Sequence, residues 1–401
     1  MSAILDKLLK GQNVEWHTIE QIFHLRNGYT PSKSNEAYWT NGTIPWFRME
    51  DIRENGNILD SALQQISESA VKGNKLFPKN SFIIATSATI GEHALITVPY
   101  LANQRFTNLS LKDDFINRFN IYFLYYYLFK LDEWCRNNTT MSSFASVDMN
   151  GFRKFEIPIP PLNVQEEIVR ILDAFTAVTA ELTAELTAEL NMREKQYQYY
   201  RDKLLSFSDS EIIWKNLDEI ANFMNGKGHE KDIHEFGEYI VVNSKFISSD
   251  GQVAKYTNNQ ICPLYNDDIL IVMSDLPNGK ALAKTFFVEE DNKYSLNQRI
   301  GRLSAKDKSQ VLPKFLYYFL NRNSQLTKFD NGTDQTNLRK DQILGVKIPI
   351  ISVERQKRIV EILDKFETLT HSITQGLPKE IALREQQYEY YREQLIDFPK
   401  N

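Results

Sequence analysis

The chain has 401 residues, of which 42% are hydrophobic and 25% are charged, a composition typical of a soluble globular protein with two or three cores. It contains no apolar run of 18 residues, its start lacks a signal-peptide core, and it has two cysteines. We therefore expect a cytoplasmic protein without a membrane span or a disulfide framework. The formal net charge of −5 does not by itself indicate a nucleic-acid partner, although a neutral domain can still carry a basic face.

The first large segment, residues 17–157, has the pattern of a compact β-rich domain. Residues 81–86 (SFIIAT) and 94–98 are short apolar runs rich in branched side chains, which predicts two strands. The aromatic stretch FLYYYL at residues 123–128 predicts a buried helix that closes the domain.

A long helix is predicted next. The IPIPP segment that precedes it holds the chain extended, because proline cannot continue a helix. Asn163 then offers an N-cap oxygen, and Glu166 stands three residues later as a capping box requires. Residues 164–206 contain no glycine or proline, and a helix of about 43 residues would be about 65 Å long. A helix of that length bridges domains.

The second half of the chain repeats the first. Trp16 in VEWHTIEQIFHLRNG matches Trp214 in IIWKNLDEIANFMNG at an offset of 198, and IVRILDAF matches IVEILDKF at an offset of 191. A slowly shrinking offset indicates two homologous modules with small loop differences rather than a solenoid. Both tryptophans stand among apolar residues, so we expect them in the module cores.

The repeat is also circular. The segment DKLL at residues 6–9 copies DKLL at residues 202–205, and each copy precedes one module. The two chain ends should therefore meet in space. The expected fold class is mixed α+β, with two homologous domains joined by two long, antiparallel coiled-coil helices in circular pseudo-two-fold symmetry. Gly376-Leu377-Pro378 should interrupt the second helix.

Motifs for catalysis are missing from the sequence. It has no phosphate-binding glycine loop, no paired CxxC and no HExxH, and its six histidines are dispersed, so neither nucleotide chemistry nor a metal site is expected. The one Pro-Pro pair lies in IPPL, which does not match the Asp/Asn-Pro-Pro-aromatic tetrapeptide of amino-methyltransferases. We expect a non-catalytic protein.

Binding residues are expected in polar loops that flank the predicted strands, because amide, hydroxyl, lysine and arginine side chains are the types that read base edges and hold phosphates. Ordinary turn residues are the alternative, since turns favour the same types, and the repeated Asn-Gln-Arg can equally be a loop brace. In the first module the candidates are Tyr29, Thr30, Ser32, Lys33, Trp46, Arg48, Thr86, Ser87, Thr89, Asn103, Gln104, Arg105, Ser142 and Ser143. In the second they are Lys227, His229, Asn243, Lys245, Ser274, Asn278, Lys280, Asn297, Gln298, Arg299, Thr333, Gln335, Asn337 and Arg339.

The whole chain resembles the specificity subunits of type I restriction-modification systems. The matching features are the IPIP-to-helix junctions at Ile157 and Ile348, the EIVRILDAF and RIVEILDKF segments, and the paired YxYYR motifs that begin at Tyr197 and Tyr388. Three tandem TAEL copies at residues 179–190 look like the spacer repeat of the type IC subgroup. Only the first helix carries this repeat.

The resemblance implies a subunit that reads double-stranded DNA, with one module for each half of a bipartite, asymmetric site. The helices would set the gap between the half-sites and dock two modification subunits and the restriction/translocase subunits. It also implies that S-adenosylmethionine, ATP and Mg²⁺ belong to those partners, and that this chain holds no cofactor. The implied domains are 1–16 (N-terminal tail), 17–157 (first recognition domain), 158–214 (helical spacer), 215–348 (second recognition domain) and 349–401 (C-terminal helical region).

An apolar stripe on the two helices is expected either to hold the helices together or to hold the modification subunits. A scaffold with two modules on a helical rod and no DNA contact is the alternative function, and an independent DNA methyltransferase is a second. The predicted stripe comprises Ile168, Ile171, Leu172, Phe175, Tyr197, Tyr200, Ile359, Ile362, Leu363, Phe366, Tyr388 and Tyr391.

Overall fold

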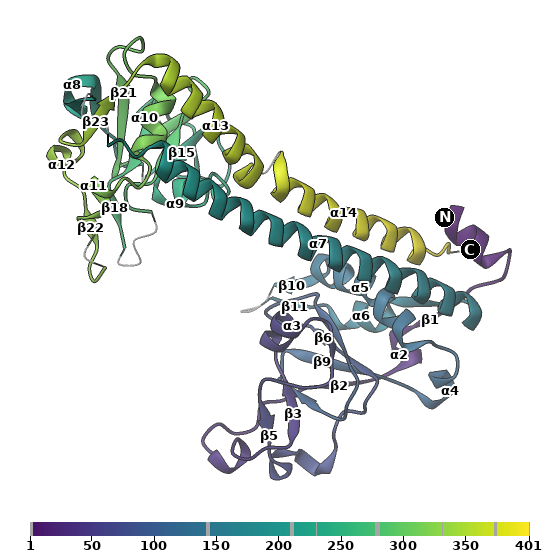
Figure 1. The fold of residues 1–401 in the computed structure, drawn as a ribbon. Coiled ribbons are helices and arrows are strands. Elements are labelled where there is room, and N and C mark those ends of the chain that lie inside the picture. The colour runs from purple at the N-terminus through teal and green to yellow at the C-terminus, as the bar shows by residue number, and fades with distance from the viewer. Residues whose placement is uncertain are drawn as a thin grey trace. The chain divides into compact units, whose positions relative to one another are not determined.

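The computed structural model describes residues 3–141, 145–208, 212–229, 231–276, 281–330, 332–372 and 375–400. The chain forms two compact units, and one helix of 43 residues, α7 (Leu162–Leu204), belongs partly to each (Figure 1). Unit 1 comprises residues 1–182 and 384–401, and unit 2 comprises residues 183–383. Each unit therefore contains one β-rich module together with a part of α7.

Unit 1 is built on two sheets. The larger has the strand order β2 (Phe23–Asn27), β9 (Phe106–Leu111), β6 (Ser81–Ala85), β7 (His93–Ile96), β4 (Ile58–Leu59). The smaller has the order β5 (Gln65–Ile66), β3 (Ile44–Phe47), β8 (Leu101–Ala102), with β3 and β8 parallel. The described strands are completed by the antiparallel pairs β1 (Glu15–Thr18) with β12 (Glu156–Ile159) and β10 (Thr139–Met141) with β11 (Ala145–Val147).

Helix α5 (Ile121–Asn137) closes the core of unit 1, as its aromatic sequence predicts. Leu124, Leu128 and Leu131 are buried in one cluster with the strands and with the first turns of α7. The remaining described helices are short: α1 (Ala3–Leu9), α2 (Ile19–Ile22), α3 (Met49–Asn55), α4 (Asp113–Ile116) and α6 (Met149–Lys154), with 3₁₀ turns η1 (Glu36–Tyr38), η2 (Glu68–Ala70) and η3 (Lys72–Asn74).

Unit 2 repeats this arrangement, which confirms the internal repeat at the level of topology. Its larger sheet has the order β14 (Ala221–Asn225), β21 (Ile300–Ala305), β17 (Ile269–Val272), β19 (Thr285–Phe287), and its smaller sheet has β16 (Tyr256–Thr257), β15 (Tyr239–Val242), β20 (Tyr294–Leu296). The antiparallel pairs are β13 (Ile213–Asn216) with β23 (Lys347–Ile350) and β18 (Ser274–Asp275) with β22 (Thr336–Asn337). The helices are α8 (Leu217–Ile220), α9 (Ser244–Ser248), α10 (Pro313–Leu320), α11 (Ser324–Thr327), α12 (Lys340–Leu344) and α13 (Val353–His371).

A buried glutamine locks each module to its long helix. In unit 1, the Gln165 side chain accepts from the Asn120 N–H at 2.8 Å and donates to the carbonyls of Arg118 and Pro160. In unit 2, Gln356 accepts from the Leu312 N–H at 2.8 Å and makes the corresponding pair of donations. Because both amides are fully buried and satisfied, each joint is rigid and specific.

A tyrosine on the covering helix makes a second joint in each unit. The Tyr126 hydroxyl donates to Asp173 at 2.6 Å, and the Tyr318 hydroxyl donates to Asp364 at 2.5 Å. Burial raises the pKa of both hydroxyls well above the usual range for tyrosine, so they stay protonated donors.

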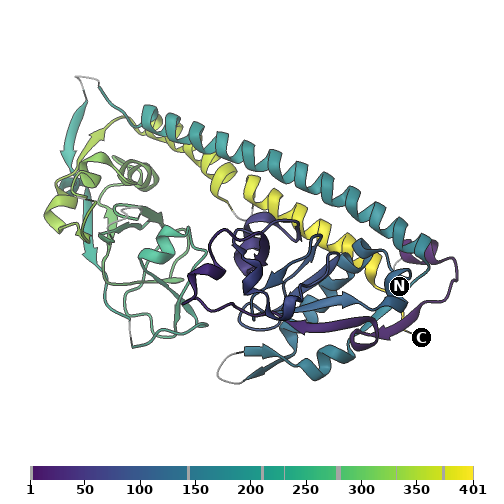
Figure 2. The same cartoon turned by 90° about the horizontal axis from the view of Figure 1, so that it is seen from below.

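The two chain ends meet inside unit 1, as the circular repeat predicts. Leu5 and Leu9 of α1 share one buried cluster with Leu395 and Ile396 at the end of α14 (Gly376–Ile396). Phe398 packs edge-on against Phe123, with ring centroids 5.9 Å apart. Both views place the N- and C-terminal labels close together (Figures 1 and 2).

Of three sequence expectations about helices and tryptophans, one is confirmed and two need correction. The N-cap at Asn163 is wrong: α7 begins at Leu162, and the Pro161 carbonyl accepts from Gln165 N–H at 3.1 Å, so Asn163 already lies in the first turn. The expected interruption of the second helix is present, since α13 ends at His371 and α14 begins at Gly376 with φ +77°. Trp214 is exposed rather than in the core, whereas the equivalent Trp16 is partly buried against the core of unit 1.

Candidate nucleic-acid interface

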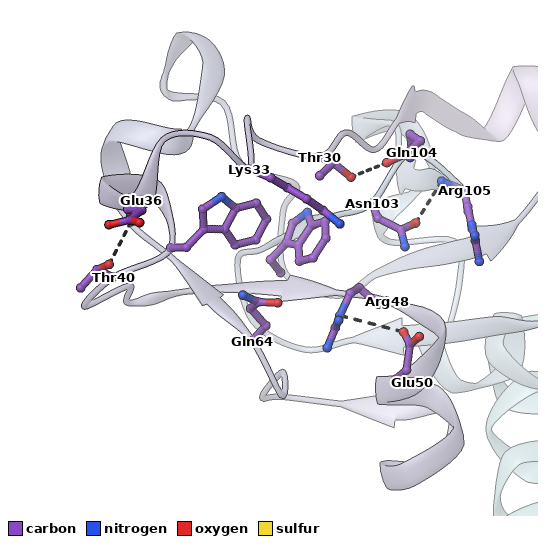
Figure 3. Close-up of a pocket in the computed structure, with 12 residues that line it drawn as sticks. Thr30, Lys33, Glu36, Thr40, Arg48, Glu50, Gln64, Asn103, Gln104 and Arg105 are labelled. Carbon is purple, nitrogen blue, oxygen red and sulfur yellow. Dashed lines mark hydrogen bonds and ion pairs between the residues drawn. The ribbon is translucent and has the colours of Figure 1, made fainter.

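Loops from separate parts of unit 1 line one cleft of about 650 Å³ (Figure 3). Seven of the residues predicted to contact DNA lie there: Thr30, Lys33, Trp46, Arg48, Asn103, Gln104 and Arg105. The other lining residues, Glu36, Trp39, Thr40, Glu50 and Gln64, were not predicted, because no local pattern indicates that their segments lie beside β3.

The loops meet because a glycine allows two backbones to touch. A side-chain carbon at Gly28 would lie 2.1 Å from the carbonyl oxygen of Asn103, so no other residue fits there. The Tyr29 N–H donates to the Ala102 carbonyl at 2.8 Å, and the Asn103 N–H donates to the Phe47 carbonyl at 3.0 Å. These bonds extend the β3–β8 pairing into the loops and fix the position of the Asn-Gln-Arg segment.

Two tryptophans form the floor of the cleft. Trp46 is buried, and its ring meets that of Trp39 edge-on at 5.0 Å. The indole N–H groups are already used, since Trp46 donates to the Tyr29 carbonyl and Trp39 to the Ser32 carbonyl, each at 3.0 Å. Trp46 therefore supports the floor of the cleft with its N–H already paired, and its contact with DNA stays a prediction.

The rim of the cleft carries hydrogen-bond donors and acceptors as well as charges of both signs. The Thr30 hydroxyl donates to the side-chain oxygen of Gln104, and the Asn103 side-chain oxygen accepts from the Arg105 backbone N–H at 3.0 Å. Both amides thus keep their NH₂ groups as the natural donors toward a ligand. The charged residues of the lining are Lys33, Arg48, Arg105, Glu36 and Glu50.

The other candidates in unit 1 lie outside this cleft. The Tyr29 hydroxyl donates to the Ala70 carbonyl and accepts from the Lys72 N–H, so it closes a loop. Ser32 pairs with Ser34 through their hydroxyls, and Thr86 pairs with Thr107. Ser87 forms an isolated bridge with Ser146 of β11, which places Ser87 beside the β10–β11 hairpin, and Thr89 is half-buried. Ser142 and Ser143 lie outside the described residues.

In unit 2 the Asn-Gln-Arg segment occupies the same kind of joint. A side-chain carbon at Gly226 would lie 2.0 Å from the Asn297 carbonyl oxygen, and Lys227 and Asn297 form a parallel bridge. Gln298 and Arg299 follow on the exposed side of the turn. The segment is therefore part of the loop brace in both modules, while its exposed members remain candidates for binding.

Three further candidates of unit 2 have structural partners. His229 is buried, with its ring nitrogens 2.9 Å from the Lys227 carbonyl and 2.8 Å from the Ser295 hydroxyl, so its prediction as a DNA contact is wrong. Asn243 caps α9 by accepting from the Phe246 N–H at 2.9 Å. Arg339 stands at the N-cap of α12 and its side chain lies 3.6 Å from Asp341.

Three other candidates of unit 2, Ser274, Gln335 and Asn337, lie at or next to the β18–β22 pair. The Gln335 amide donates to the Ser274 hydroxyl at 2.8 Å, and Ser274 is opposite Asn337 in the ladder. Lys245 and Thr333 are exposed. Asn278 and Lys280 lie outside the described residues.

The predicted apolar stripe on the helices divides into two classes. Ile168, Leu172, Tyr197, Ile359 and Leu363 are buried in the module cores, so these five side chains are not accessible to a partner, and they pack against the modules as well as between the helices. On the surface, Phe175 stacks on Tyr391 at 5.2 Å in unit 1, and the equivalent Tyr200 stacks on Phe366 at 5.6 Å in unit 2. The members left partly or largely exposed are Ile171, Phe175, Tyr200, Ile362, Phe366, Tyr388 and Tyr391.

Antiparallel contact between the helices is present within each unit. In unit 1, Phe175 meets Tyr391, whereas the following Thr176 donates to the hydroxyl of the earlier Tyr388 at 3.0 Å. In unit 2, Tyr197 and Tyr200 of α7 both pack on Phe366 of α13. None of the described helices is long and apolar enough to cross a membrane.

The chain matches known proteins over nearly its whole length. Residues 12–192 and 211–383 each match the type I restriction modification DNA specificity domain. The specificity subunit of the type I restriction enzyme EcoprrI from Escherichia coli is 44% identical, with 93% of this chain and 92% of that protein covered. The EcoR124I/EcoR124II specificity subunit from the same species is 36% identical over 71% of this chain and 72% of that protein.

Solved structures agree in fold. The HsdS subunit from Thermoanaerobacter tengcongensis has a TM-score of 0.51 at 15% identity and covers 96% of each chain. A chain from a study of complex assembly and conformational transition of the type I R-M system has a TM-score of 0.60 at 13% identity, covering 96% of this chain and 98% of its own. With two matched domains and a relative that is 44% identical over more than nine-tenths of both chains, the chain belongs to the specificity subunits of type I restriction-modification systems, their non-catalytic DNA-recognition component.

Proposed function

We propose that each module of this chain reads one half of a bipartite, asymmetric DNA site, and that the helices set the gap between the half-sites. The observation that carries this is the cleft of unit 1, where seven side chains predicted as DNA contacts converge from loops far apart in sequence. Its rim combines hydrogen-bond donors, acceptors and cations, as direct readout of base edges requires. The topological repeat supplies a second module of the same design.

The exposed aromatic pairs on the helices are the proposed binding sites for two modification subunits. Phe175 with Tyr391 and Tyr200 with Phe366 occupy equivalent places in the two units, which suits two copies of one partner. Aromatic residues are enriched where proteins bind one another. In this proposal S-adenosylmethionine, ATP and Mg²⁺ belong to the modification and restriction subunits, and the complex works in the cytoplasm. The three TAEL copies support membership of the type IC subgroup.

DNA binding by the assembled complex should depend steeply on salt. Neutralising phosphates releases counterions, so a complex with 6–10 phosphate contacts loses roughly 10³- to 10⁵-fold in affinity between 50 and 200 mM salt. The measurement is a titration of a labelled duplex with the purified chain and its modification subunits at both salt concentrations. A complex that assembles fully but binds no duplex at 50 mM salt would instead support a protein scaffold without DNA contact.

A further inference from the structure

The cleft of unit 1 carries an arginine and a glutamate whose charged ends have little structural role. The Arg48 Nε lies 3.9 Å from a carboxylate oxygen of Glu50, and the two side chains are 30% and 56% exposed. Among the described residues, the Arg48 Nε has no hydrogen-bond partner. A partly exposed ion pair of that length contributes little to stability, so the pair is available for a ligand.

The backbone under this pair is nevertheless held firmly. The Arg48 N–H donates to one oxygen of the buried Asp51 at 2.6 Å, and the Leu63 N–H donates to the other oxygen at 2.6 Å. The Arg48 guanidinium lies 5.7 Å from the ring of Trp46, which forms the floor of the cleft. Arg48 is the residue before α3 and Glu50 lies in its first turn, so both side chains start from fixed positions.

The mixture of charges favours a base edge over a phosphate as the ligand. Glu36 and Glu50 line the same cleft as the cations, and a carboxylate repels a phosphate at close range. A base-pair edge in the major groove, in contrast, presents acceptors and donors side by side.

We propose that Arg48 and Glu50 together read one G·C base pair in the half-site that unit 1 contacts, an inference that rests on the proposed DNA-reading function. The guanidinium fork of Arg48 can donate to both O6 and N7 of the guanine, the geometry for which two parallel donors are suited. The carboxylate of Glu50 accepts only, and the N4 amino group of the paired cytosine donates. An A·T pair in the same place would be disfavoured. Its adenine amino group is a donor that would face the donors of Arg48, and its thymine O4 is an acceptor that would face the acceptors of Glu50.

The test is to measure binding and methylation by the complete complex on duplexes in which each base pair of the first half-site is changed in turn. The wild-type complex should lose about 5- to 150-fold in affinity when one particular G·C pair becomes A·T, the range for a lost bidentate contact. Arg48→Gln should remove this discrimination and favour adenine at that position, because glutamine pairs with N6 and N7 of adenine. Glu50→Gln should relax discrimination at the same base pair and at no other.

Arg53→Gln is the matched control, since Arg53 is an exposed arginine of α3, five residues after Arg48, and should leave the base preferences unchanged. A uniform loss across all sequences with Arg48→Gln, accompanied by a weaker salt dependence, would make Arg48 a phosphate contact and overturn the inference. If Arg48→Gln does not fold, Glu50→Gln decides, and unchanged base preferences in that variant reject the pair as a reader. Failure of the wild-type complex to prefer any sequence would instead reject the proposed function itself.

Discussion

Deleting one TAEL copy, residues Thr183–Leu186, is expected to shorten the unspecified gap of the DNA site by one base pair and to leave both half-sites unchanged. Four residues of helix correspond to about 6 Å and to about 40° beyond one full turn. One base pair of DNA advances roughly 3.4 Å and turns about 35°. The change in rotation of the helix therefore matches that of one base pair, and the change in its length lies between the rise of one base pair and that of two.

The structure explains why the helix should survive this deletion. The TAEL segment lies within α7, and none of its leucines is buried, with Leu182 37% exposed. The boundary between the two units falls after Leu182, so the deleted residues lie outside the core of unit 1. Because the following copy has the same sequence, every residue after the deletion meets the same neighbours along the helix.

Deleting only Thr183 and Ala184 is the matched control. Two residues turn the helix by about 200°, which should place the second module on the wrong side of the DNA and abolish site-specific methylation. Methylation mapping in cells that carry each variant is the measurement. An unchanged gap with full activity after the four-residue deletion would show that the segment is a filler and does not measure distance.

Replacing Leu172 by glutamate should lower the melting temperature of the chain by roughly 8–16 °C. Leu172 is fully buried in the core of unit 1, and placing a charge there while removing packed carbon atoms costs about 4 kcal/mol or more. For a unit of about 200 residues, each kcal/mol shifts the melting temperature by roughly 2–4 °C.

Leu182→Glu makes the same chemical change ten residues further along the same helix. Because Leu182 is 37% exposed, its free energy of unfolding should change by no more than about 0.5 kcal/mol. Calorimetry of both variants distinguishes a stripe that is packed inside a module from one that faces a partner. Equal melting temperatures would contradict the assignment of Leu172 to the core.

Features coded by neighbouring residues could be predicted from the sequence. The length of α7 follows from an unbroken run of helix-forming residues, and the buried strand β6 follows from the apolar run SFIIA. The meeting of the chain ends could also be predicted, because the DKLL repeat revealed which segment α1 replaces.

Features that depend on distant partners could not be predicted in this way. Gln165 has the sequence context of an ordinary helical residue, yet it is buried because the Asn120 N–H, 45 residues earlier in the chain, requires an acceptor. The cleft residues Glu50 and Gln64 have no motif, since they are brought together by the β3–β5 pairing and by the bond from the Leu63 N–H to Asp51. His229 was misassigned because its partner Ser295 lies 66 residues away.

The most direct test of independent reading by two modules is to replace residues 17–155 with the same region of a relative and to map methylated adenines across the genome. The joints at Gln165 and Gln356 fix each module to the helices separately. The module taken from the relative should therefore recognise the half-site that it recognises in the relative. We expect one half-site to change while the other half-site and the gap stay the same. A simultaneous change of both half-sites would contradict this expectation.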